Sequence, residues 1–542
     1  MEKLWLKNMD PNIPTEIDPD SHPSVWHMAK EAMTKFGDKV AFSNFGAEIS
    51  YKDLDRLSSN LSAYLQSELG LHKGDRIAIM CPNILAFPIT LMANLRAGLV
   101  QVNVNPQYTG RELAHQLNDA DTETIVIFSG STPTLSEIIG KTRIKNVIVV
   151  KPGDFGNAST PSPDIDPGIG EHILFVDAIS KGANLEVHQV DIMGDDLLFL
   201  QYTGGTTGLS KGAALSHRNL VANINQFSAS MQTLLVDGEE VVITALPLYH
   251  IFALMVNCLS FFVKGSTNVL ITNPGDMPGF VEELSRWPFT AITGVNTLFN
   301  GLLHTPGFKA LDFTTLKLAA GGGTAIQEAI SNKWRQATGA HITEGYGLSE
   351  TSPVLTFNQV DPDKFSSSIG IPMPSTEISL RDEDGNEVAI GEPGELCAKG
   401  PQVMSGYWRN EEETKKVTTD DGYFMTGDVA ILTEDGLFKI VDRMKDMIIV
   451  SGFNVYPNEI EAVIANMEGV LESACIGVPS EKTDEAVKLF VVKNEGADIN
   501  EADVIEFCRE HLVRYKVPKQ VEFIDTVPKS AVGKILRREL RA

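Results

Sequence analysis

The sequence predicts an α/β protein that has a large layered part and a smaller mixed α+β part at its carboxyl end. Three observations support this fold class. The chain has 542 residues, 43% of them hydrophobic, which is enough for several folding units with buried cores. Short apolar runs alternate with amphipathic segments over most of the chain. After about residue 370 the pattern changes to short alternating runs punctuated by glycines, which is typical of antiparallel strands.

The first part should contain strands that are buried on both faces, because their runs are continuously apolar. The expected strands are 76–80, 100–104, 122–128, 146–150, 197–202, 268–272 and 289–295. A helix is expected over 51–69, since Ser50 can cap it together with Asp53 three residues on. The segment 151–170 is rich in Pro, Gly, Ser and Asp and is expected to be a surface loop. We place a domain boundary close to Asp442.

Composition argues against several classes of protein. A net charge of −26 repels a polyanion, so binding to nucleic acid is not expected. The five cysteines are widely spaced, which disfavours a disulfide scaffold or a zinc site and favours the reducing cytoplasm. Residues 77–95 and 241–263 are uncharged and long enough to cross a bilayer, but both contain proline and other polar breaks. We therefore expect both to be buried core. The acidic first twenty residues do not suggest a signal peptide.

The clearest chemical motif is YTGGTTGLSKG at 202–212, directly after a predicted strand. Its glycines allow close approach of the backbone, its threonines offer hydroxyl donors, and Lys211 adds a cation, so the loop suits phosphate oxygens. It is not a Walker loop, because Ser210 precedes the lysine and Gly212 follows it. A flexible Gly/Thr linker is the alternative, and the buried strand before the loop favours phosphate binding.

This loop resembles that of the adenylate-forming enzymes, which comprise acyl-CoA synthetases, amino-acid adenylation domains and firefly-type luciferases. Further motifs follow in family order: LPLYHIFAL (246–254), AAGGG (319–323), EGYGLSE (344–350), GELCAKGPQVMSGYW (394–408), YFMTGD (423–428), DRMKD (442–446), SGFNVYPNEIE (451–461) and PKSAVGK (528–534). The chain is most similar to the bacterial long-chain fatty acid–CoA ligases. It departs from the family where Gly204, Ser210 and Ser349 replace the common Ser, Pro and Thr.

The resemblance implies an N-terminal domain over 1–441 with α/β subdomains and a distorted β-barrel, a hinge linker over 442–446 and a mobile C-terminal domain over 447–542. It also implies ATP-dependent activation of a long-chain fatty acid to an acyl-adenylate, followed by transfer to CoA, with Mg²⁺ as cofactor. The alternatives are a ligase for another acid or acceptor (an aryl-CoA or acyl-ACP ligase) and a catalytically silent fatty-acid-binding relative. The sequence leaves open whether the protein forms a homodimer and whether it contacts the cytoplasmic face of a membrane.

Site residues also follow from the resemblance. Lys534 would bridge the substrate carboxylate and the α-phosphate, Thr203 and Glu350 would hold Mg²⁺, and His250 would shape the acyl site. Taken singly, a loop glutamate is more often solvated, and a lysine among basic residues is more often part of a tail. Tyr346 would lie on the adenine, and Asp428 and Arg443 would reach the ribose. The remaining nucleotide-binding residues would be Gly204, Gly205, Thr206, Thr207, Gly208, Lys211, Gly322, Gly323, Glu344, Gly345, Gly347 and Lys445. CoA would pass Ser451, Gly452 and Phe453, and Asp442 would be the hinge.

Overall fold

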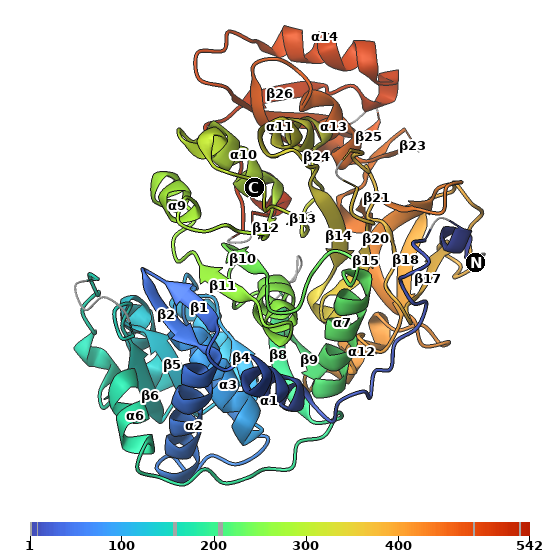
Figure 1. Ribbon diagram of the computed structural model, residues 1–542. Helices are drawn as coiled ribbons and strands as arrows, with labels where there is room; N and C mark the ends of the chain where they lie inside the picture. The colour runs from blue at the N-terminus through green and yellow to red at the C-terminus, as the bar shows by residue number, and fades with distance from the viewer. Residues whose placement is uncertain are drawn as a thin grey trace.

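Two large sheets with helices packed against them form the body of the molecule, and a small C-terminal domain lies at one end of it (Figure 1). The computed structural model describes residues 3–7, 9–155, 160–203, 210–361, 363–451, 453–480, 483–530 and 533–541. The predicted α/β class is confirmed by both large sheets, whose strands are mainly parallel and buried.

The first sheet has eight strands in the order β19-β9-β8-β4-β3-β5-β6-β7. It is parallel from β7 to β8 and antiparallel at the β8–β9–β19 edge. Its strands are β3 (Arg76–Met80), β4 (Val100–Asn103), β5 (Thr124–Phe128), β6 (Asn146–Val150), β7 (Ile173–Leu174), β8 (Leu197–Thr203), β9 (Lys211–Ser216) and β19 (Gly406–Tyr407). The helices in this part of the chain are α2 (Tyr51–Ser67), α3 (Ala86–Ala97), α4 (Gly110–Asp119), α5 (Thr132–Ser136) and α6 (Phe175–Gly182). As predicted, Ser50 caps α2 by accepting a hydrogen bond from Asp53 N.

The second sheet has nine strands in the order β16-β15-β14-β13-β12-β10-β11-β1-β2. Its strands are β1 (Val40–Asn44), β2 (Ala47–Ser50), β10 (Val241–Thr244), β11 (Thr267–Leu270), β12 (Ala291–Gly294), β13 (Leu318–Gly321), β14 (Thr343–Gly347), β15 (Val354–Phe357) and β16 (Ile371–Pro372). The helices of this region are α1 (Val25–Phe36), α7 (His217–Ser230), a π-helix (Ala253–Ser260), α8 (Phe261–Val263), α9 (Met277–Leu284), α10 (Asn296–His304) and α11 (Glu328–Thr338).

Both uncharged stretches that are long enough for a bilayer are packed inside the protein. Residues 77–95 run through β3 and the buried helix α3, and residues 241–263 run through β10 and the buried π-helix. None of the described helices combines the length and the apolarity needed to span a membrane. The prediction that these stretches are core is therefore confirmed.

The antiparallel region predicted after residue 370 is confirmed by a four-stranded sheet with the order β17-β18-β20-β21. Its strands are β17 (Glu377–Arg381), β18 (Gly394–Lys399), β20 (Phe424–Leu432) and β21 (Phe438–Arg443), and α12 (Glu411–Lys416) precedes β20. A bridge between Gly370 and Phe438 links this sheet to the edge of the nine-stranded sheet. Trp5, near the N-terminus, packs on Phe438 with ring centroids 5.6 Å apart.

The C-terminal part forms a sheet in the order β23-β22-β25-β24, with β26 paired to β25. Its elements are β22 (Ile448–Val450), β23 (Phe453–Val455), α13 (Pro457–Ile464), β24 (Val470–Ser480), β25 (Asp484–Lys493), α14 (Glu501–His511), β26 (Gln520–Phe523) and α15 (Arg537–Leu540). These residues bury an apolar cluster that is separate from the large core. Helix α13 begins at Pro457, and the domain boundary near Asp442 stays a prediction.

Candidate active site

The ends of the predicted phosphate loop lie side by side at one end of a hairpin. Strands β8 and β9 are antiparallel, and their register places Thr203 opposite Lys211. Gly204, Gly205, Thr206, Thr207 and Gly208 lie outside the described residues. His115 on α4 donates from Nε2 to the carbonyl oxygen of Ser210 at 2.8 Å, so α4 supports the C-terminal end of the loop, directly before β9.

Glu350 lies in a short 3₁₀ turn (Ser349–Thr351) after β14, and only 8% of its surface is exposed. The Tyr407 hydroxyl donates to Glu350 Oε1 at 2.8 Å. Oε2 of Glu350 makes no hydrogen bond with a described residue. A buried carboxylate with one unused oxygen can accept a cation or a further donor.

Tyr346, Asp428 and Arg443 form a second cluster. The Tyr346 hydroxyl donates to Asp428 Oδ2 at 2.6 Å, and Arg443 Nε lies 3.3 Å from Asp428 Oδ1. Asp428 on β20 and Arg443 on β21 are register partners, so the sheet itself brings the two charges together. Burial, followed by the Asp428 charge, raises the pKa of Tyr346, and its hydroxyl stays a donor.

Lys534 reaches this centre from the C-terminal domain. A β-carbon on Gly323 would lie only 3.7 Å from Lys534 Cε, so the lysine lies against the AAGGG loop. Gly533 before it has a φ of +75°, a backbone conformation that favours glycine over residues with a side chain. Burial, then the charge of Arg443, lowers the pKa of Lys534, while Asp428 and Glu350 oppose that shift.

The segment that carries Lys534 is tied back to its own domain by buried charges. Arg537, three residues further on, donates from Nη2 to both carboxylate oxygens of Glu461 at 2.9 Å. Its Nη1 lies 3.6 Å from Asp446 Oδ2, in the 3₁₀ turn (Met444–Asp446) of the predicted hinge. These contacts hold the Lys534 segment on α13 and next to the linker.

His250 lies near Lys534 on the wall of the site. Burial, followed by the charge of Lys534, lowers the pKa of His250 to about 3. Its Nδ1 accepts from Phe252 N at 3.3 Å, so this nitrogen carries no proton and the ring is neutral. A β-carbon on Gly322 would lie 3.2 Å from the Phe252 ring and from the Gly345 carbonyl oxygen, so a side chain here would crowd both groups.

Glu344 is a buried carboxyl on β14, beside Gly321 on β13. From the described residues its Oε2 accepts one long hydrogen bond, 3.4 Å, from Ile326 N. Burial raises the pKa of Glu344 to about 8, so the group is protonated at neutral pH. Gly345 and Gly347 follow in the same strand, which pairs with β15.

The predicted hinge residue is itself a cap for the C-terminal domain. Asp442 accepts from Arg443 N at 2.7 Å and from Asn458 N, in the first turn of α13, at 2.9 Å. Burial raises the pKa of the Asp442 carboxyl. Burial, followed by the charge of Arg443, lowers the pKa of Lys445 to about 8.

Two of the residues expected to contact CoA, Ser451 and Phe453, lie at the β22–β23 hairpin of the C-terminal domain. Ser451 N donates to Thr483 O at 2.9 Å, and Phe453, which is 55% exposed, stacks on Tyr515 with centroids 4.7 Å apart. Gly452 lies outside the described residues. The described contacts of Ser451 and Phe453 are therefore within their own domain.

Three polar contacts of the site involve residues that the motifs did not predict as site residues. His115 holds Ser210, Tyr407 holds Glu350, and Glu413 on α12 forms an ion pair with Lys211. Tyr407 lies in the motif at 394–408, but no local sequence pattern marks His115 or Glu413 as site residues. Glu413 is part of an acidic run, which by itself indicates only a solvated helix turn.

The residues present fit a magnesium ion that is mostly coordinated by phosphate oxygens. Among the described residues no group of three or more His, Cys, Asp or Glu side chains could hold a metal ion by itself. Glu350 offers Oε2, to which no described residue donates a hydrogen bond, and Thr203 adds a hydroxyl at the start of the phosphate loop. A few hard oxygen donors are the usual protein contribution to Mg²⁺ bound with a nucleotide.

Comparison with known proteins matches nearly the whole chain. Residues 29–408 match the AMP-binding enzyme family, and residues 459–534 match the AMP-binding enzyme C-terminal domain. The long-chain-fatty-acid–CoA ligase of Yersinia pestis is 51% identical, with all of this chain and 98% of that protein covered. The ligase of the same name from Salmonella typhimurium is 50% identical with the same coverage.

A solved structure agrees with the fold. ATP-bound MatB from Rhodopseudomonas palustris superposes with a TM-score of 0.82 at 31% identity, covering 95% of this chain and 98% of that one. The family match covers well over half of the chain, and the relatives extend over its full length. The chain therefore belongs to the AMP-binding, adenylate-forming enzymes and, within them, to the long-chain-fatty-acid–CoA ligase family.

Proposed function

We infer that this protein activates a long-chain fatty acid with ATP and transfers it to CoA. A fatty-acid carboxylate oxygen attacks the α-phosphorus of ATP, the bond to the β-phosphate breaks, and pyrophosphate leaves. The CoA thiolate then attacks the acyl carbon, the carbon–oxygen bond breaks, and AMP leaves. The observation that carries the proposal is the identity of about half of all residues, over the full chain, with long-chain-fatty-acid–CoA ligases.

The first step brings two anions together, so cations must offset their repulsion. Lys534 supplies one charge between the fatty-acid carboxylate and the α-phosphate, and its position against Gly323 supports this role. Lys211 supplies a second charge to the outer phosphates from the edge of the phosphate loop. Thr203 and Glu350 would hold Mg²⁺, which offsets phosphate charge when bound.

Tyr346 and Asp428 orient the nucleoside. The Asp428 carboxylate is positioned by the Tyr346 hydroxyl and by Arg443, so it can accept hydrogen bonds from the ribose hydroxyls. Neutral His250 closes the acyl side of the centre and takes no proton, because its pKa lies far below neutral pH. Asp442 is the hinge around which the C-terminal domain turns between the two steps.

The test is pyrophosphate release by the full chain, with ATP and Mg²⁺ and a panel of acids, with and without CoA. We expect the highest rate with a long-chain fatty acid, and acyl-CoA as product only when CoA is present. A preference for an aromatic acid, or for acyl carrier protein as acceptor, would overturn the substrate or acceptor assignment. Binding of fatty acid without pyrophosphate release would show a non-catalytic protein.

A further inference from the structure

One short segment contacts both charged groups that the proposed function assigns to the phosphates and their metal ion. Residues 407–413 run from the end of β19 into α12. Tyr407 at its start donates to Glu350 at 2.8 Å, and Glu413 at its end forms an ion pair with Lys211. The Lys211 ammonium also lies 5.0 Å from the centre of the Tyr407 ring, over its face.

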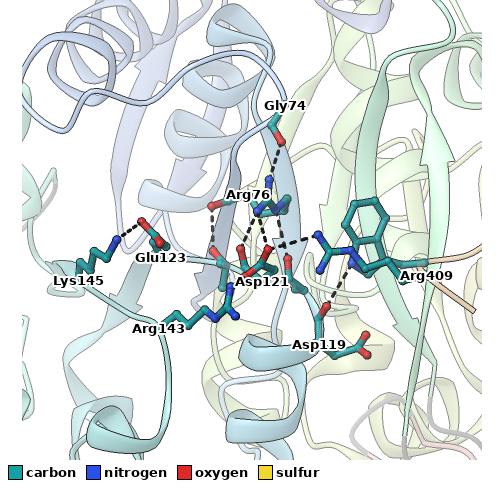
Figure 2. A network of polar contacts seen from close by, with 11 residues as sticks. Gly74, Arg76, Asp119, Asp121, Glu123, Arg143, Lys145 and Arg409 are labelled. Carbon is teal, nitrogen blue, oxygen red and sulfur yellow. Dashed lines mark hydrogen bonds and ion pairs between the residues drawn. The ribbon is translucent and has the colours of Figure 1, made fainter.

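This segment is fixed to the body of the large domain on its outer side. Figure 2 shows Arg409 pointing to Asp121, and Arg409 Nη2 lies 3.3 Å from Asp121 Oδ2. Asp121 also forms ion pairs with Arg76 and Arg143. Arg409 and Asp121 have φ values of +50° and +54°, which non-glycine residues adopt only when their surroundings impose it. Trp408 adds hydrogen bonds from N to Gly212 O at 2.7 Å and from Nε1 to Asp119 O at 3.1 Å. These contacts hold the segment in place, with Tyr407 against Glu350 and Glu413 against Lys211.

Glu413 is held in place as an anion. Asn410 caps α12 by accepting from Glu413 N at 3.1 Å, and Lys416 donates to Glu413 Oε1 at 2.7 Å. The hydrogen bond from Lys211, then that from Lys416, lowers the pKa of Glu413 to about 2. The side chains of Lys211 and Glu413 are 32% and 27% exposed, so water can replace either partner and the pair can open.

The Lys211 ammonium thus serves two anions: the carboxylate of Glu413 and, in the proposed function, the outer phosphates of ATP. We propose that Glu413 is a positioning residue that competes for Lys211, weakens polyphosphate binding and so promotes release of pyrophosphate. This inference rests on the proposed function, which brings the outer phosphates to Lys211.

The test compares Glu413→Gln with Glu412→Gln in the full chain. Glu412 is the neighbouring carboxylate, which pairs only with Lys416 among the described residues, at 2.9 Å, and serves as the matched control. Glu413→Gln should lower both the inhibition constant of inorganic pyrophosphate and the KM for ATP by about two- to fivefold, the range expected for a partly exposed ion pair. The KM for the fatty acid should not move, and Glu412→Gln should behave as wild type. Weaker or unchanged pyrophosphate binding in Glu413→Gln would overturn the proposal.

A double variant tests whether Glu413 acts through the lysine. In Lys211→Ala, the further change Glu413→Gln should no longer alter pyrophosphate affinity. If the full effect of Glu413→Gln persists without Lys211, competition for the lysine is refuted. Calorimetric titration of the full chain with magnesium pyrophosphate gives the same comparison without any acid substrate. Failure of every acid to release pyrophosphate would refute the proposed function, while the titration would still decide the role of Glu413.

Discussion

Replacing Lys534 by alanine is expected to slow formation of the acyl-adenylate by about 10²–10³, the usual cost of losing one preorganised donor. The structure supports a loss of this size. The ammonium lies against Gly323, its pKa is influenced by Arg443, Asp428 and Glu350, and the ion network of Arg537 fixes its backbone segment. Arg443 remains in the variant, but it is paired with Asp428 and cannot replace the missing charge.

Two half-reactions measured separately test this prediction. Pyrophosphate release reports the first step, and CoA capture of supplied acyl-adenylate reports the second. The second step should stay near the wild-type rate, because the charge that Lys534 contacts develops only in the first. Arg538→Ala is the matched control, since this exposed cation on α15 should leave both steps unchanged. An equal loss in both steps, or a loss below tenfold in the first, would refute the assigned role.

The pH dependence of the first step gives a second measurement on the same lysine. Burial and Arg443 lower the pKa of Lys534, so the ammonium loses its proton at a lower pH than an ordinary lysine. Because the charged form is the active one, the rate should be full below that pKa and should fall as the pH rises through it. The residual rate of Lys534→Ala should lack this alkaline fall. A wild-type rate that instead rises through the same range would contradict the reasoning.

Three further predictions follow from the site and the linker. Glu350→Gln should raise the Mg²⁺ concentration needed for half-maximal pyrophosphate release and should leave the melting temperature unchanged. If the Mg²⁺ titration does not change, Glu350 is not a ligand of the ion. Asp442→Pro fixes φ near −65° and should leave at most one of the two half-reactions at the normal rate. Asp442→Ala is the control, because it removes the hydrogen bond to Asn458 N without fixing φ. Normal rates of both half-reactions in Asp442→Pro would show that the hinge is not at this residue. Because the folded pKa of Glu344, about 8, lies above its unfolded value, wild-type stability should fall as the pH rises through the window between these values. Glu344→Gln should flatten this fall in thermal melts, and equal slopes would refute burial as its cause.

Local features of the fold could be predicted because they depend on residues close together in the sequence. The apolar runs at 76–80 and 146–150 are strands with the expected bounds, since continuous apolar runs suit a sheet covered on both faces. The Ser50 cap was also predicted, because a helix cap depends on residues only three positions apart. The order of the motifs predicted the family, which the comparisons confirmed.

The sequence alone thus determined the strands at 76–80 and 146–150, the Ser50 cap, the motifs and the family. Tertiary structure alone decided which charges meet: Tyr407 with Glu350, Lys211 with Glu413, and Lys534 with the AAGGG loop. Glu413 lies 202 residues from Lys211 along the chain, so neither periodicity nor spacing could pair them. Such contacts arise because sheet register and domain packing bring distant segments together, and that arrangement depends on the whole buried core.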